Sequence, residues 1–98
     1  MRVYSTGRPP GLRCVGEVDF TNHGDWQAAL GTLPTADEVH LDPSELRFID
    51  THGTLILVEA SQGTASDRRL VLHHPPVAML RVLRQFWPAE AAIEVARS

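Results

Sequence analysis

The chain has 98 residues, of which 43% are hydrophobic and 21% are charged. These values are typical of one folded soluble domain, expected to span residues 1–98, and they exclude a disordered chain. All nine cationic side chains are arginines and the formal net charge is −3. The chain therefore lacks the lysine of Schiff-base or P-loop chemistry, and its charge argues against non-specific nucleic-acid binding.

Two short runs typical of strands, Arg2–Tyr4 and Leu12–Val15, begin the chain. The segment between them, Gly7–Gly11, contains glycines and prolines that supply turn dihedrals, so the sequence predicts an N-terminal hairpin. Cys14 is the only cysteine and lies in the second run beside an apolar neighbour. We expect it to be a small buried hydrophobe.

A first helix is predicted to run through Leu30, with Thr21 or Asn22 as its N-cap. Apolar residues recur in this segment at the spacing of one helix face, which is expected to face the core. These residues are Trp26, Ala29, Leu30 and Leu33. Gly31 and Pro34 are expected to end this helix. The next segment, Glu38–Asp42, alternates polar and apolar residues, which predicts a central strand that leads into a loop.

A second helix is expected over Thr51–Ser61, where apolar residues occur on nearly every side and only Glu59 is charged. Such a helix should be buried over most of its circumference, with Gly63 as its stop. Arg69–His73 then predicts another apolar strand.

A third helix is expected to start at Pro75–Pro76 and to end at Pro88, with Arg81 and Arg84 beside its apolar face. The side chains assigned to that apolar face are Val77, Leu80, Leu83 and Phe86. Ile93–Val95 predicts a last short strand. Two strands followed by alternating helices and strands indicate an α/β fold with a largely parallel sheet and helical crossovers.

The histidines form no recognisable metal-ligand motif, because His23, His40, His52 and the pair His73–His74 lie in different elements. We expect structural or surface roles for them and no metal or cofactor. No nucleophile-elbow or reactive-cysteine pattern is present either, so the sequence predicts no enzyme and no small-molecule substrate. No apolar run reaches the roughly 20 residues that span a bilayer, which predicts a cytoplasmic protein without membrane contact.

The most informative segment is Asp42–Gly53, where a polar turn directly precedes the buried helix. Asp50 can accept a hydrogen bond from the first helical turn, and Thr51 and His52 should project outward. This pattern is explained by a helix cap alone, or by a phosphoacceptor at Thr51, where the helix dipole favours added negative charge. Eight acidic residues between positions 17 and 50, against one arginine, also favour a basic partner.

Two motifs resemble the STAS domain, which is named for sulfate transporters and anti-sigma factor antagonists. Gly16–Asp19 is similar to the family's Gly-Glu-apolar-Asp segment, and Leu41–Gly53 is similar to its longer signature around an Asp-Ser-x-Gly turn. The resemblance implies a mixed sheet with helices mainly on one face. Here Thr51 stands where serine is usual, His52 replaces a small residue and Thr54 replaces a common leucine.

For bacterial anti-sigma factor antagonists, the resemblance implies a protein that binds an anti-sigma factor that is also a serine/threonine kinase. The residue after the signature aspartate is the one phosphorylated in that branch, and it maps onto Thr51. The expected partner-binding residues are Asp19, Asp50, Thr51, His52 and Gly53. The alternative is a STAS subunit, or a ligand-sensing STAS domain, of a transporter or sensor complex that is not phosphorylated.

Overall fold

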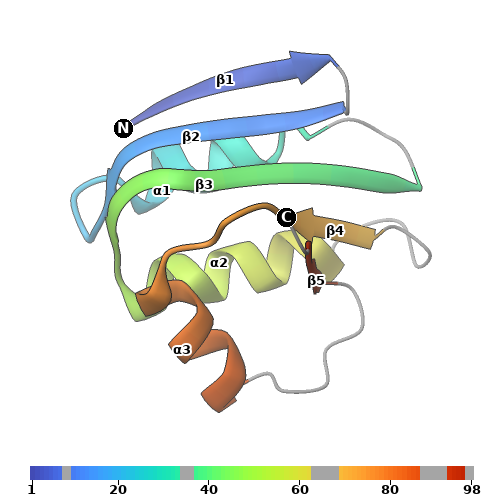
Figure 1. Cartoon of the computed structure of the whole chain (residues 1–98). Coiled ribbons are helices and arrows are strands. Elements are labelled where there is room, and N and C mark those ends of the chain that lie inside the picture. Colours follow the sequence, from blue (N-terminus) through green and yellow to red (C-terminus); the bar gives the residue numbers. More distant parts are fainter. Residues whose placement is uncertain (8–9, 34–36, 63–68, 87–92, 97–98) are drawn as a thin grey trace.

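The structure is a computed structural model that describes residues 1–7, 10–33, 37–62, 69–86 and 93–96 (Figure 1). In chain order its elements are β1 (Arg2–Gly7), β2 (Pro10–Val18), α1 (His23–Leu30), β3 (Glu38–Ile49), α2 (Thr51–Gln62), β4 (Arg69–Leu72), α3 (Val77–Phe86) and β5 (Ile93–Val95). This order confirms the predicted alternation. The expected stops at Pro34, Gly63 and Pro88 lie outside the described residues.

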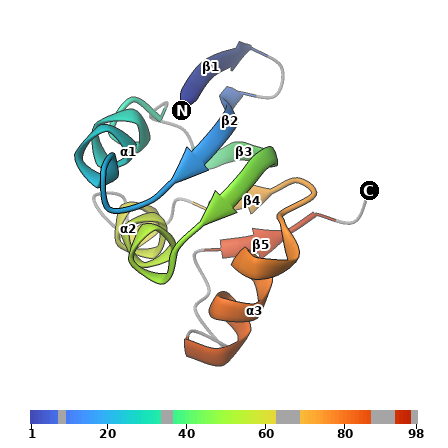
Figure 2. The same ribbon diagram turned by 90° about the vertical axis from the view of Figure 1, so that its left-hand side faces the viewer.

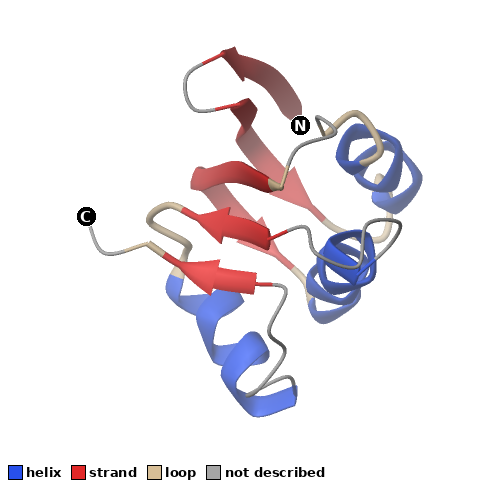
Figure 3. Cartoon of the chain, turned by 90° about the vertical axis from the view of Figure 1, so that its right-hand side faces the viewer, coloured by secondary structure: helices blue, strands red, loops and turns tan. Residues whose placement is uncertain are grey.

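The five strands form one sheet in the order β1-β2-β3-β4-β5. β1 pairs antiparallel with β2, and every later pair of neighbours is parallel. Parallel neighbours need a crossover, and each crossover here contains a helix. Helices α1 and α2 lie side by side along the sheet, and α3 packs against α2 and β3 (Figures 2 and 3). The predicted α/β fold with a mixed, mostly parallel sheet is therefore confirmed.

The core fills the space between the sheet and the helices. Trp26 of α1 and Leu57 of α2 are fully buried there together with Cys14 of β2, as expected for these apolar side chains. Glu59 of α2 is exposed, and the helix otherwise buries most of its residues, which confirms the predicted burial. In the part of the chain that the structure describes, no helix is long and apolar enough to cross a bilayer.

The hairpin is longer than predicted, because Pro10 and Gly11 belong to β2 and not to the turn. Gly11 pairs with His40 of β3, and a Cβ atom on Gly11 would overlap the carbonyl oxygen of His40. The glycine therefore permits a close approach of two neighbouring strands, which a turn assignment from composition does not anticipate.

The predicted loop after Asp42 is wrong, because β3 continues as one 12-residue strand to Ile49. β3 pairs with β4 from Glu38 to Leu41 and with β2 along most of its length. Beyond Leu41, the edge of β3 that faces β4 is therefore not paired with β4. Pro43 lies in that region, at a register shift against β2, where its missing N–H removes no ladder bond.

The apolar face predicted for α3 is also partly wrong. Val77 is 69% exposed, and the residues that enter the core are Met79 and Leu83, four positions apart. The helix therefore turns a different stripe toward its neighbours, α2 and β3. A helix with apolar residues on two adjoining stripes does not reveal from spacing alone which stripe is covered. The side chain of Phe86 is outside the described part of the structure.

Candidate functional site

Asp19 and Asp50 lie at the same end of the sheet. β2 and β3 are parallel neighbours, and their last residues, Val18 and Ile49, are paired in register. Each aspartate directly follows its strand, so the two motifs identified in the sequence meet at one edge. The backbone N–H of Asp50 donates to the carbonyl oxygen of Val18 at 3.1 Å, which extends the pairing to the signature turn.

The carboxylate of Asp50 caps the first turn of α2. Its Oδ1 accepts a hydrogen bond from the backbone N–H of Gly53 at 2.6 Å, which confirms the predicted cap. The carbonyl oxygen of Asp50 accepts from the backbone N–H of Thr54 at 3.1 Å. Thr51 and His52, the first two residues of α2, are exposed as expected. The turn thus presents a hydroxyl and an imidazole at the positive end of a helix.

His23, the first residue of α1, completes this arrangement. Its Nε2 contacts both carboxylate oxygens of Asp50, at 2.9 Å to Oδ1 and 2.8 Å to Oδ2. The ring of His23 also lies against the ring of His52, with 4.6 Å between their centroids. The imidazole of His23 therefore connects the beginnings of the two helices. Sequence analysis missed this role, because His23 and Asp50 are 27 positions apart and no motif joins them.

Gly53 is buried beneath the exposed residues Thr51 and His52, and neighbouring side chains pack closely around it. A Cβ atom there would lie 2.8 Å from Val18 Cγ1 and 3.0 Å from both Asp50 Oδ1 and Ile49 Cγ1. Its carbonyl oxygen accepts a hydrogen bond from the buried indole Nε1–H of Trp26 at 2.9 Å. A residue without a side chain is thus required for α2 to start against β2 and α1.

Asp19 organises the turn between β2 and α1. Its Oδ1 accepts hydrogen bonds from the hydroxyl of Thr21 at 2.5 Å and from the backbone N–H of Thr21 at 2.9 Å. These two bonds, the hydroxyl first, hold the pKa of Asp19 below its ordinary value. Of the five predicted partner-binding residues, Asp19 and Asp50 are partly exposed, Thr51 and His52 are exposed, and Gly53 is buried.

Asn22 occupies the N-cap position of α1, as one of the two predicted candidates, but its side chain does not cap the helix. Its Nδ2 donates to the carbonyl oxygen of Glu17 at 2.8 Å, and its Oδ1 accepts from the backbone N–H of Asp19 at 3.0 Å. The amide side chain is thus used to hold the turn against the end of β2. The cap prediction failed because this alternative use depends on tertiary placement.

Two of the three remaining histidines form a second spatial pair. His40 Nδ1 lies 2.6 Å from His73 Nε2, and His40 Nε2 lies 3.0 Å from Glu38 Oε1. This chain of polar contacts joins β3 to the residue after β4. No group of three or more potential metal ligands occurs among the described residues. The pair therefore has a structural explanation as a cross-strand contact.

Comparisons with known proteins agree with the two sequence motifs. A solved structure of the anti-sigma factor antagonist SpoIIAA in its unphosphorylated form is similar to this chain, with a TM-score of 0.60 and 20% sequence identity over 90% of this chain and 79% of that chain. This likeness establishes the fold. No curated protein matches the sequence. A family model described as "Mlab, STAS domain" matches residues 1–86, and the chain therefore belongs to the STAS domain family.

Proposed function

We propose that this protein is a partner-switching regulator similar to anti-sigma factor antagonists. In this proposal it binds an anti-sigma factor that is also a serine/threonine kinase, and phosphorylation of Thr51 releases that partner. The observation that carries the proposal is the exposure of Thr51 at the first position of α2, beside the capping carboxylate of Asp50. Thr51 is the substrate of the partner's kinase activity, and the protein itself performs no catalysis and needs no cofactor.

The recognition surface consists of Asp19, Asp50, Thr51 and His52, with Gly53 beneath them as the residue that lets α2 begin there. Asp50 is held by His23 and by the Gly53 N–H, so the turn is already ordered before binding. A preorganised surface loses little conformational entropy when a partner docks. The acidic side chains around it favour a partner with a basic face, which increases the rate and specificity of association.

A phosphate on Thr51 would act mainly through its charge. It adds about −1.5 to −2 charges at neutral pH, one residue from Asp50 and at the same sheet end as Asp19. The α2 dipole would offset about 0.3–1 kcal/mol of the cost within the domain itself. When the partner covers this surface, the phosphate loses its hydration, and water no longer screens its repulsion from the neighbouring carboxylates of Asp50 and Asp19. About 1.4 kcal/mol suffices for a tenfold loss of affinity. The domain would stay folded while the complex dissociates.

The second candidate function is a STAS subunit of a transporter or sensor complex without phosphorylation. The contact between His23 and His52 favours it, because a kinase must accommodate an imidazole held directly next to the acceptor hydroxyl. In this case the N-terminus of α2 would be a permanent docking surface, and Thr51 would only contribute its hydroxyl to the contact.

Affinity capture separates the two functions. Lysate of the source cells is passed in ATP-containing buffer over immobilised wild-type protein, Thr51→Glu and Thr51→Ala, and both retained proteins and bait are analysed by mass spectrometry. The proposal predicts that wild type retains a small ATPase-type kinase that Thr51→Glu does not retain. It also predicts phosphate on wild type and none on Thr51→Ala.

Retention of the same transporter or sensor subunit by wild type and Thr51→Glu, with no phosphate on either, would contradict the partner switch and support the second function. The Thr51→Ala variant separates loss of the hydroxyl from gain of charge, because it should retain the kinase without being modified.

A further inference from the structure

Phe20 is the most exposed large hydrophobic side chain among the described residues, with 84% of its surface accessible. It lies between Asp19, which follows β2, and His23, the first residue of α1, which contacts Asp50. Burying a phenylalanine is favourable by about 1.5–3 kcal/mol. Because Phe20 is exposed, this free energy does not stabilise the fold and is available for binding. This position suits contact with a partner.

The turn that carries Phe20 is closed by several hydrogen bonds. The backbone N–H of Asn22 donates to the carbonyl oxygen of Asp19 at 3.1 Å, so Phe20 is the second residue of a four-residue turn. The side chains of Asp19 and Asn22 add the bonds to Thr21 and Glu17 already described. The backbone of Phe20 is therefore held in place before any binding, which is the property expected of an interface anchor.

Acidic side chains surround this position in the chain. Glu17 and Asp25 are exposed and Asp19 is partly exposed, and they lie within five residues of Phe20 on the same turn or on the elements next to it. A turn that carries an exposed apolar ring and is flanked along the chain by carboxylates is complementary to an apolar pocket with a cationic rim. The same charges disfavour insertion into an anionic lipid surface.

We propose that Phe20 is the apolar anchor of the partner interface and enters a hydrophobic pocket, rimmed by arginine or lysine, on the protein that binds the α2 terminus. This inference rests on the proposed function in that it places the anchor at the same surface. It also specifies the partner's binding site: one pocket that accommodates an aromatic ring, next to the cationic groups that face Asp19 and Asp50.

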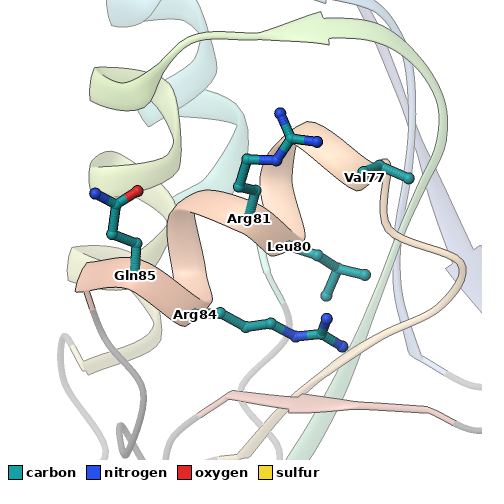
Figure 4. A pocket seen from close by; sticks show the side chains of 5 residues that line it. All are labelled: Val77, Leu80, Arg81, Arg84 and Gln85. Atoms are coloured by element: carbon teal, nitrogen blue, oxygen red, sulfur yellow. The ribbon is translucent and has the colours of Figure 1, made fainter.

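A second exposed apolar side chain provides a matched control. Val77 lies on α3 beside a hollow of about 530 Å³ lined also by Leu80, Arg81, Arg84 and Gln85 (Figure 4). It is 69% exposed, but it lies on α3 near Arg81 and Arg84, whereas Phe20 lies in the turn between β2 and α1 (Figure 2). If exposed apolar residues bind other proteins non-specifically, positions 20 and 77 should crosslink to the same proteins. A specific anchor should crosslink to the partner only at position 20.

The test is site-specific photo-crosslinking in lysate of the source cells. The variants Phe20→p-benzoylphenylalanine and Val77→p-benzoylphenylalanine of the full chain are irradiated, and crosslinked peptides are identified by mass spectrometry. We expect position 20, and not position 77, to crosslink to one protein, at apolar residues flanked by arginine or lysine. We also expect Phe20→Ala to weaken binding of that protein, once purified, by about tenfold or more, with Phe20→Leu intermediate and Val77→Ala unchanged.

Crosslinks from both positions to the same proteins, to lipid or to a second copy of this chain would overturn the inference, as would unchanged affinity of Phe20→Ala. These outcomes differ from failure of the proposed function. If the protein crosslinked at position 20 is not a kinase, the anchor stands and the phosphorylation switch fails. If a kinase binds Phe20→Ala as tightly as wild type, the switch stands and the anchor fails.

Discussion

The imidazole of His23 contacts both carboxylate oxygens of Asp50, at 2.9 and 2.8 Å, and so connects the first turn of α1 to the residue that caps α2. Both side chains are less than a third exposed. The same carboxylate accepts the Gly53 N–H. The position of the turn before Thr51 therefore depends on a residue from a different helix.

Replacing this histidine should destabilise the fold. Hydrogen bonds to charged groups contribute about 1.5–3 kcal/mol when partly buried, so we expect His23→Ala to lower the free energy of unfolding by about 1–2 kcal/mol. For a domain of this size that corresponds to a decrease in melting temperature of about 4–8 °C per kcal/mol. Thermal unfolding followed by circular dichroism measures it. The exposed His52→Ala is the control and should change stability by less than about 0.5 kcal/mol; equal losses would contradict the role of His23.

Gly53, beneath the site, lies where no side chain fits. In Gly53→Ala the new Cβ would press against Val18, Ile49 and Asp50, and overpacking of this kind costs about 1–3 kcal/mol. Gly24 in α1 has nothing within 4 Å of the same position, so Gly24→Ala should stabilise by up to about 1 kcal/mol through helix propensity. Urea unfolding of both variants measures these changes. A Gly53→Ala variant as stable as wild type would contradict the close packing of Gly53 against Val18, Ile49 and Asp50.

The two sequence motifs were sufficient to predict the cap by Asp50 and the exposure of Thr51 and His52, because capping depends on residues within one helical turn. The contact of His23 with Asp50 could not be predicted, since it exists only once two parallel strands end side by side. For the same reason the length of β3 was underestimated. A proline such as Pro43 indicates a loop in a sequence analysis. It is tolerated in this strand because β4 pairs with only the first part of β3.

Cys14 provides a prediction of pH dependence. Burial, reinforced by the charge of Asp42, raises the pKa of the Cys14 thiol to about 12. The unfolded chain ionises near the ordinary thiol pKa of about 8.5, so the folded state binds more protons than the unfolded state between these values. The stability contributed by the neutral thiol is present below that lower pKa and is lost as pH rises toward the higher one.

The measurement is denaturant unfolding over a series of alkaline pH values, for wild type and Cys14→Ala. The decline of stability with pH should be steeper in wild type than in Cys14→Ala. At mildly alkaline pH the folded protein should react with a maleimide only after urea is added. Rapid labelling without urea would mean that Cys14 is accessible and that its thiol is not protected by burial.

Asp19 gives the opposite pH dependence. The hydroxyl and backbone N–H of Thr21 lower the pKa of Asp19, so this carboxylate stabilises the fold above its unfolded-state pKa of about 3.9, and that stability is lost as pH falls through the lower folded value. A carboxyl-carbon NMR titration should place the Asp19 midpoint below its ordinary value. In Thr21→Val the midpoint should move upward, because the hydroxyl donor is removed. An unchanged midpoint would show that the turn does not depend on this bond.

The central claim is that negative charge at Thr51 dissociates the partner, and the dissociation constant of the purified partner for Thr51→Glu and Thr51→Gln tests it most directly. The two side chains match in size and differ in charge. We predict that Thr51→Glu raises Kd by about tenfold or more, equivalent to at least about 1.4 kcal/mol, while Thr51→Gln stays close to wild type and both variants keep the wild-type melting temperature. Equal affinities of Thr51→Glu and Thr51→Gln would contradict the partner switch.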